Sequence, residues 1–244
     1  MTSTKPAASV TLLGVGHVFD LRRQVTDEIA RRMPDVVALE LDPARWRALR
    51  APPETPREGP IAYRAMASFQ DRLARAYGVR AGDEMRAAAD IARDLRVPIA
   101  LIDMEAATVM QRLRREMPFG EKARLALSTL GGLFIPARGV EAQVEQLASD
   151  YGPAFDEMAR KFPTLKRILL DDRNHHMARA LARLHREGRS VVAVVGDGHV
   201  DGVTAALLAD GVPTEAVRLR EMRRTDGPAE GTATAHFEVE TRLD

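Results

Sequence analysis

The stretch that decides the fold of this chain is Val191-Val192-Ala193-Val194-Val195-Gly196-Asp197-Gly198-His199. Its apolar run is too short for a core helix and stops at two glycines and a histidine. This pattern is typical of a buried strand that opens into a tight turn. A similar stretch, Val10-Thr11-Leu12-Leu13-Gly14-Val15-Gly16-His17, lies near the N-terminus. We therefore expect two buried strands, almost at opposite ends of the chain, that bring His17 and His199 together.

The composition bounds the class of protein. The chain has 244 residues, of which 45% are hydrophobic and 29% charged, as in ordinary soluble globular proteins. Its 36 basic and 35 acidic residues leave a net charge of +1, so the overall charge of the chain does not favour binding to nucleic acid. The absence of cysteine excludes disulfides and thiolate zinc sites. No signal peptide or bilayer-spanning stretch is recognisable, and we expect a soluble cytoplasmic protein.

Between the two strands, apolar patterns predict alternating helices and strands. Apolar residues four apart predict a helix over 21–33, and Val36–Leu39 and Val97–Ile102 are short apolar runs typical of buried strands. A further strand is expected at 217–219 and an edge strand at 236–241. Strands separated by helices indicate an α/β fold with a mostly parallel or mixed central sheet flanked by helices. We expect one domain over 8–222 and a flexible tail over 223–244.

The middle of the chain lacks any strand pattern. Residues 105–163 are expected to form a helical insertion or cap, with helices near 106–117, 121–130, 139–149 and 153–161. The apolar stretch 125–135 is either a helix buried in this cap or a homodimer contact. A long helix is expected from Thr164 to Glu187, ended by Gly188.

Polar side chains follow four of the predicted strands: His17, Glu40 with Asp42, Asp103, and His199. Ligands of parallel sheets bind beyond the carboxyl ends of the strands. The glycines Gly14, Gly16, Gly196 and Gly198 would let the backbone turn sharply there, and the residue between each pair, Val15 or Asp197, looks interchangeable. Each histidine could instead cap a turn, or each turn could bind phosphate at a helix N-terminus. The dinucleotide fingerprint is incomplete, since Phe19 and Asp201 stand where glycine is required.

Arg173 interrupts an apolar line of the long helix, with Asp172 and His176 beside it. An arginine in such a line is costly unless it is paired. It forms either a buried ion pair that ties the helix to the sheet, or a group presented to the substrate or to an oxyanion. Two histidines and a carboxylate suit a divalent metal or general acid–base chemistry. Neither Gly-x-Ser-x-Gly nor His-Glu-x-x-His is present.

Taken together, several of these segments resemble the TraB/PrgY family, within the wider TIKI superfamily. The matching segments are 13–18, 34–42 with Arg45, 82–85, 101–103 before Thr108, 172–178 and 192–200. The resemblance implies a site made by two Gly-x-x-His motifs and a glutamate, here His17, His199 and Glu40. Some animal members look like metal-dependent proteases, and the bacterial branch is linked to shutdown of peptide pheromone signalling. Related folds include erythromycin-esterase-like and haem-binding ChaN-like proteins.

The chain departs from the family pattern at two site-proximal positions and in its membrane segments. Asp172 stands where the family usually has glutamate, and Met104 stands where a basic residue is usual. Many microbial members also carry C-terminal membrane segments, and no such segment is found in this sequence.

The resulting hypothesis is a metal-dependent, peptidase-like hydrolase that acts on a peptide or another carbonyl-containing substrate. His17, Glu40 and His199 would hold a divalent transition metal such as Mn, Co or Zn, or Glu40 would act as general base. Arg173 would bind the oxyanion or a substrate carboxylate, oriented by Asp172. Supporting roles are expected for Gly14, Gly16, Asp42, Asp103, Asn174, His176, Gly196 and Gly198. The alternatives are a peptide-sequestering protein without catalysis and, more weakly, a haem-binding protein.

Overall fold

The protein is described by a computed structural model in which residues 9–16, 19–51, 82–132 and 159–224 are placed. His17, the expected helices over 139–149 and most of 153–161, and the expected strand at 236–241 lie outside these residues. None of the described helices is long and apolar enough to cross a membrane.

Five parallel strands form one sheet in the order β3-β2-β4-β1-β5, which confirms the expected α/β fold. The central pair joins the two stretches that carry the Gly-x-x-His motifs, with Val10 opposite Val191 and Val15 opposite Gly196. Because both strands run the same way, their carboxyl ends lie side by side. The strands are β1 (Val10–Val15), β2 (Val36–Leu39), β3 (Ile99–Leu101), β4 (Val191–Gly196) and β5 (Thr214–Val217).

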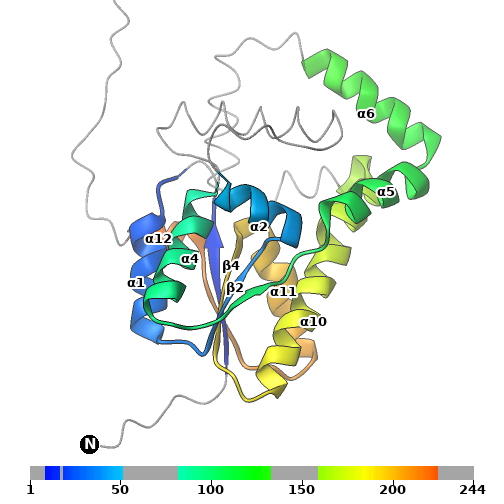
Figure 1. The fold of residues 1–244 in the computed structure, drawn as a ribbon. Helices are drawn as coiled ribbons and strands as arrows, with labels where there is room; N and C mark the ends of the chain where they lie inside the picture. Colours follow the sequence, from blue (N-terminus) through cyan, green and yellow to red (C-terminus); the bar gives the residue numbers. More distant parts are fainter. Residues whose placement is uncertain (1–8, 17–18, 52–81, 133–158, 225–244) are drawn as a thin grey trace, which may run out of the picture.

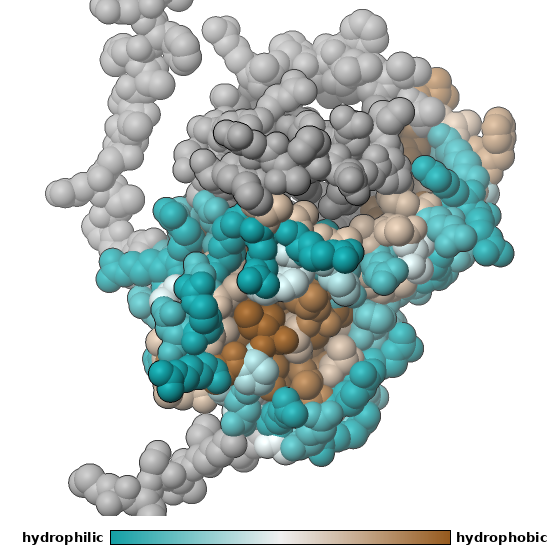
Figure 2. All heavy atoms as spheres, in the orientation of Figure 1, coloured by the Kyte–Doolittle hydropathy of each residue, from teal (hydrophilic) through white to brown (hydrophobic). Residues whose placement is uncertain are grey.

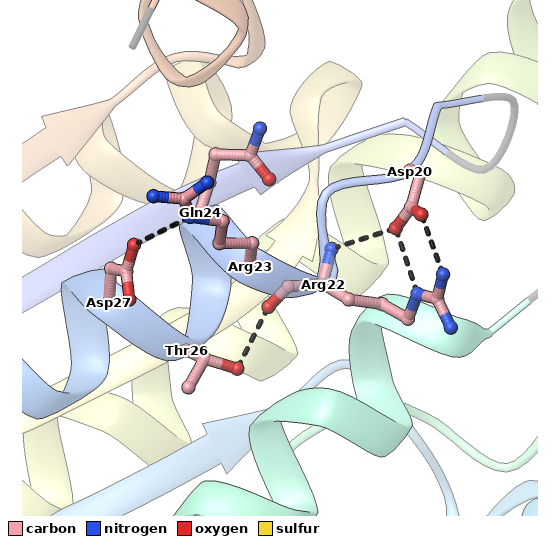
Figure 3. A pocket seen from close by; sticks show the side chains of 6 residues that line it. All are labelled: Asp20, Arg22, Arg23, Gln24, Thr26 and Asp27. Atoms are coloured by element: carbon pink, nitrogen blue, oxygen red, sulfur yellow. Dashed lines mark hydrogen bonds and ion pairs between the residues drawn. The ribbon is translucent and has the colours of Figure 1, made fainter. Parts of the chain in front are cut away.

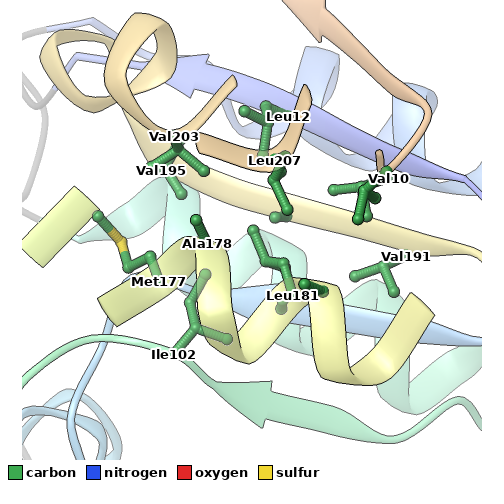
Figure 4. Packing of buried hydrophobic residues seen from close by; sticks show 14 of the residues in the cluster. Val10, Leu12, Ile102, Met177, Ala178, Leu181, Val191, Val195, Val203 and Leu207 are labelled. Atoms are coloured by element: carbon green, nitrogen blue, oxygen red, sulfur yellow. The ribbon is translucent and has the colours of Figure 1, made fainter. Parts of the chain in front are cut away.

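Helices cover both faces of the sheet (Figure 1). One face packs against α1 (Arg22–Arg32), α4 (Asp83–Asp94) and α12 (Leu219–Arg224). The other packs against α10 (Asp172–Arg186) and α11 (Asp197–Ala209), as Figure 4 shows in detail. A shorter helix, α2 (Pro43–Arg50), follows β2 directly.

Strand β4 shows why its sequence is apolar without interruption. Val191, Ala193 and Val195 belong to the core on the α10–α11 side, and Val192 and Val194 belong to the core on the α1–α4 side. All five side chains are at most 2% exposed. A strand covered by helices on both faces needs apolar residues at every position.

The C-terminal strand begins earlier than the sequence pattern indicates. The strand expected at 217–219 is β5, Thr214–Val217, which pairs with β1 from Val10 opposite Thr214. Leu219 is buried because it opens α12 and packs on the α1 side, so its apolar character reflects a helix.

The described part of the expected insertion is helical. It comprises α5 (Ala106–Glu116) and α6 (Phe119–Gly132), which extend away from the sheet (Figure 1). Phe119 and Leu127 are largely exposed. Figure 2 shows a second apolar area in the middle of its face, between the hydrophilic surfaces of the flanking helices, at the edge of the sheet. The edge strand there is β3, whose three residues are half-buried.

The long helix expected over 164–187 is not uniform. It consists of α9 (Pro163–Lys166), a π-helical turn η1 (Arg167–Asp171) and then α10. The N–H of Asp172 bonds the carbonyl of Arg167, five residues back. A π turn inserts one extra residue, so the side chains that follow it are rotated relative to a continuous α-helix. Ile168 before the π turn and Met177 after it are both buried although they are nine positions apart, and Arg173 lies between them.

Candidate functional site

The candidate site lies at the carboxyl edge of the sheet, across three neighbouring strands. Asp103 comes just after β3, Glu40 directly after β2, and Gly196 ends β4. His199 sits in the first turn of α11, which begins at Asp197. The next strand in the sheet, β1, ends at Val15, two positions before His17.

Glu40 is held at both carboxylate oxygens. Its Oε2 accepts the Gly196 N–H at 2.6 Å, and its Oε1 accepts Arg173 Nη2 at 2.5 Å. Burial alone would raise the pKa of this carboxyl, but the charge of His199 when its ring is protonated, the charge of Arg173 and the Gly196 N–H lower the pKa below its ordinary value. The Glu40 carboxylate is therefore ionised at neutral pH.

Arg173 joins Glu40 to Asp103. Its Nε donates to Asp103 Oδ1 at 2.9 Å and its Nη2 to Asp103 Oδ2 at 2.7 Å, while its Nη1 donates to the Leu169 carbonyl at 3.2 Å. Of the five N–H groups of a guanidinium, these contacts and the one to Glu40 occupy four. Through its ion pairs with Glu40, which follows β2, and with Asp103, which follows β3, Arg173 ties α10 to the sheet.

A second arginine extends this network. Arg45 Nη2 contacts Asp103 Oδ2, and its Nε donates to Asp42 Oδ2 at 2.9 Å. Opposing burial, Arg173 and Arg45 together hold the pKa of Asp103 below its ordinary value. Asp42 is fully buried and also caps α2 through the N–H groups of Ala44 and Arg45. Its contacts are those of a structural carboxylate.

His199 is buried and is bonded at one ring nitrogen. Its Nδ1 lies 2.6 Å from Asn174 Oδ1, and its Nε2 lies 3.4 Å from Glu40 Oε1. Burial lowers the pKa of this imidazole, although the Glu40 charge opposes it. In the neutral ring, a proton shared with the Asn174 oxygen leaves Nε2 as an acceptor. Two acceptors, Nε2 and Oε1, then face one another, an arrangement that a cation between them would stabilise.

This pair of atoms fits a divalent metal. Zinc ligands lie about 2.0–2.2 Å from the ion, so two of them in tetrahedral geometry are roughly 3.4 Å apart. The donor types, imidazole nitrogen and carboxylate oxygen, suit Zn, Mn or Co. Among the described residues, however, no group of three His, Asp or Glu side chains converges on one point. Asp103 turns to its arginines, and a third protein ligand would have to come from beyond the described residues, where His17 lies.

Asp172 was expected to orient Arg173, but its carboxylate has other partners. Its carboxylate pairs with Arg112 Nη2 at 2.7 Å and with Arg167 Nη1 at 3.3 Å. Consecutive residues of a helix point in directions about 100° apart, so Asp172 faces α5 while Arg173 faces the sheet. The residue that orients Arg173 is Asp103.

His176 lies one turn after Arg173 on α10 and is half-buried. Burial lowers the pKa of its imidazole, with Asp103 opposing and Arg179 and Arg183 adding to the effect. Its neighbour His175 is exposed and bonds the Asp171 carbonyl through Nδ1.

The glycines of the two turns differ in how much space each leaves for a side chain. A Cβ at Gly14 would lie 2.4 Å from Asp197 Oδ1, whereas one at Gly196 would lie 3.4 Å from Glu40 Oε2, an ordinary contact. Gly16 is buried and its carbonyl accepts the Phe19 N–H at 3.1 Å, and Gly198 is half-buried in the first turn of α11. The structure also corrects the expectation that position 197 is interchangeable, since Asp197 is buried and paired with Arg218.

Sequence reasoning missed three contributors: Arg45 as a member of the network, the π turn before Arg173, and Gly202. A Cβ at Gly202 would lie 2.1 Å from Asn174 Nδ2. Arg45 stands in a segment that matched the family, and no sequence signal marks the other two.

A shallow surface hollow lies apart from this site. It is lined by Asp20, Arg22, Arg23, Gln24, Thr26 and Asp27 at the start of α1 (Figure 3). Asp20 and Arg22 form an exposed ion pair there, at 2.7 Å. None of the residues that surround Glu40 lines it.

The fold and the site define the class of protein: an all-parallel α/β domain with a carboxylate, an imidazole and an arginine network at the carboxyl edge of its sheet. The chain belongs to the TraB/PrgY/gumN family, whose model matches residues 2–215. It is also similar to an uncharacterised protein of Methanocaldococcus jannaschii, with 28% identity over 210 residues, which are 81% of this chain and 53% of the relative. The chain thus spans about half the length of the curated relative that it matches.

Proposed function

We propose that this chain is a metal-dependent hydrolase that acts on a peptide bond or another carbonyl substrate. The observation that carries the proposal is the approach of His199 Nε2 to Glu40 Oε1, which are 3.4 Å apart on side chains only 8% and 10% exposed. This distance is long for a hydrogen bond and suitable for two ligands of one ion. The metal ligands would be Glu40, His199 and His17.

The charge balance of the network supports a bound cation. The described ion pairs join three carboxylates to two guanidiniums, so one negative charge is left over. A buried charge is costly unless it is compensated. With a neutral His199, a divalent ion at Glu40 would compensate this negative charge and leave the network with one net positive charge. The members of the network are Glu40, Asp42, Asp103, Arg45 and Arg173.

A divalent ion in this place would polarise the substrate carbonyl as a Lewis acid and make water nucleophilic at neutral pH. The protein's own groups would prepare the site. Gly196 and Arg173 keep the Glu40 carboxylate ionised and fixed, and Asn174 holds the imidazole. The remaining N–H of Arg173 Nη1 is the group we assign to the substrate oxygen or carboxylate.

The test is metal binding followed by turnover. Purified protein, stripped with a chelator, is titrated with Mn²⁺, Co²⁺ and Zn²⁺ by calorimetry and then screened against peptides and esters. We expect binding of one ion per chain and metal-dependent hydrolysis. His199→Ala and Glu40→Gln should lose the ion, while the exposed His175→Ala should keep it as the matched control.

The outcomes separate the candidate functions. Unchanged metal affinity in His199→Ala would contradict the metal assignment. Metal or peptide binding without turnover in the whole panel would contradict the hydrolase and favour a protein that sequesters peptides.

A further inference from the structure

The contact between α10 and α11 contains a glycine, Gly202, that faces a buried asparagine, Asn174. The two helices pack against each other on one face of the sheet. Gly202 lies on α11, three positions after His199, and residues three apart share a helix face. Asn174, opposite on α10, is only 7% exposed.

Asn174 fills the space that Gly202 leaves. A Cβ at position 202 would stand 2.1 Å from Asn174 Nδ2 and 2.8 Å from Asn174 Cγ. Both distances are far inside van der Waals contact, so any larger residue at 202 would displace the amide. The Asn174 amide therefore lies where it does because position 202 has no side chain.

The same amide reaches the imidazole. Asn174 Oδ1 lies 2.6 Å from His199 Nδ1, and the other ring nitrogen faces Glu40. A partner at one ring nitrogen decides which tautomer is present and how the ring is turned. Histidines that bind metals usually carry such a partner, and its loss typically costs about 10–100-fold in metal affinity.

We propose that Gly202 and Asn174 are positioning residues for His199: the bare position 202 seats the Asn174 amide, which keeps the ring proton on Nδ1 and turns Nε2 toward Glu40. The consequence for metal affinity rests on the proposed function. The placement of the ring does not, and it can be measured in metal-free protein.

The variants form a double-mutant cycle. Gly202→Ala pushes the amide away, Asn174→Ala removes it, and the double variant has no amide left to displace. Gly120→Ala is the matched control, because it also places alanine in a helix and nothing lies within 4 Å of the added Cβ. Residues that act only through one another show strong non-additivity in such a cycle.

The primary measurement is ¹⁵N NMR of the His199 ring in metal-free protein. We expect wild type and Gly120→Ala to carry the proton on Nδ1, and Gly202→Ala and Asn174→Ala to shift toward the Nε2-protonated tautomer. The double variant should resemble Asn174→Ala alone. A His199 ring protonated on Nε2 in wild type, or unchanged in Gly202→Ala, would overturn the proposal.

Metal titration gives the second readout. We expect affinity to fall about 10–100-fold in Gly202→Ala and in Asn174→Ala, without a further fall in the double variant. An additive loss in the double variant would contradict an action of Gly202 through Asn174. If wild type shows the expected tautomer but binds no metal, the proposed function fails and the positioning of His199 stands.

Discussion

Asp197 and His199 stand two residues apart in the first turn of α11, and they are buried to nearly the same extent, 7% and 6% exposed. Asp197 is saturated: it accepts Arg218 Nε at 3.0 Å, Arg218 Nη2 at 2.8 Å and the Leu219 N–H at 2.9 Å. His199 instead has one nitrogen bonded to Asn174 and the other 3.4 Å from a carboxylate oxygen.

The difference shows that burial and charge alone do not mark a functional residue. Both side chains follow the same strand, and both contact a charged partner. The Asp197 pair is complete within the chain and fastens α11 to α12. The His199–Glu40 pair is looser: with a neutral ring, Nε2 lies 3.4 Å from an oxygen that already accepts Arg173 Nη2. Under the proposed function, a metal ion would lie between these two atoms.

The largest effect is expected at Asp197. Asp197→Ala leaves Arg218 and the Leu219 N–H without their acceptor, and we expect a loss of about 3 kcal/mol in the free energy of unfolding. The part-exposed Arg218 keeps some contact with solvent and with Asp201, which limits the loss. Urea denaturation followed by circular dichroism measures it. A loss below about 1 kcal/mol would contradict a structural role for this pair.

Gly14 packs against the same carboxylate. In Gly14→Ala, the added Cβ lies 2.4 Å from an Asp197 oxygen that Arg218 holds in place, so we expect a loss of roughly 1–3 kcal/mol from overpacking. Gly14→Ala in the Asp197→Ala background should cost much less. Equal costs in the two backgrounds, by the same denaturation, would mean that the clash lies elsewhere.

His199→Ala tests the His199–Glu40 pair. The ring makes one hydrogen bond within the described residues, and we expect a smaller loss in stability, about 1–2 kcal/mol, together with loss of metal binding. Calorimetry measures both the stability and the metal binding of the same preparation. A stability loss as large as that of Asp197→Ala would mean that His199, too, is structural.

Much of the fold could be predicted from the sequence, because a strand buried on both faces leaves an unmistakable apolar run. Val191–Val195, Val36–Leu39 and the strand before Asp103 are all found. The positions of Glu40, Asp103 and His199 at one edge followed from the parallel order. The π turn, the Gly202–Asn174 contact and the Asp197–Arg218 pair were missed. They depend on which side chains meet across two helices, and no local pattern in the sequence encodes that.

An exposed ion-pair group gives the smallest expected effect. Hydrogen bonds from Arg112 and Arg167 lower the pKa of Glu116 from its ordinary 4.5 to about 2. A lowered folded-state pKa contributes stability that is present above the ordinary value and is lost as pH falls toward the folded value. We expect Glu116→Gln to lower the melting temperature slightly at pH 6, and the difference from wild type to shrink between pH 4.5 and 2.5. A constant difference over that range would mean that the carboxylate charge contributes nothing.

The central claim is that Glu40 and His199 hold one metal ion, and anomalous diffraction from a crystal soaked in Co²⁺ tests it most directly. The predicted result is an anomalous peak about 2.0–2.2 Å from both His199 Nε2 and a Glu40 carboxylate oxygen. A well-ordered site without such a peak, or a peak that contacts neither residue, would contradict the account.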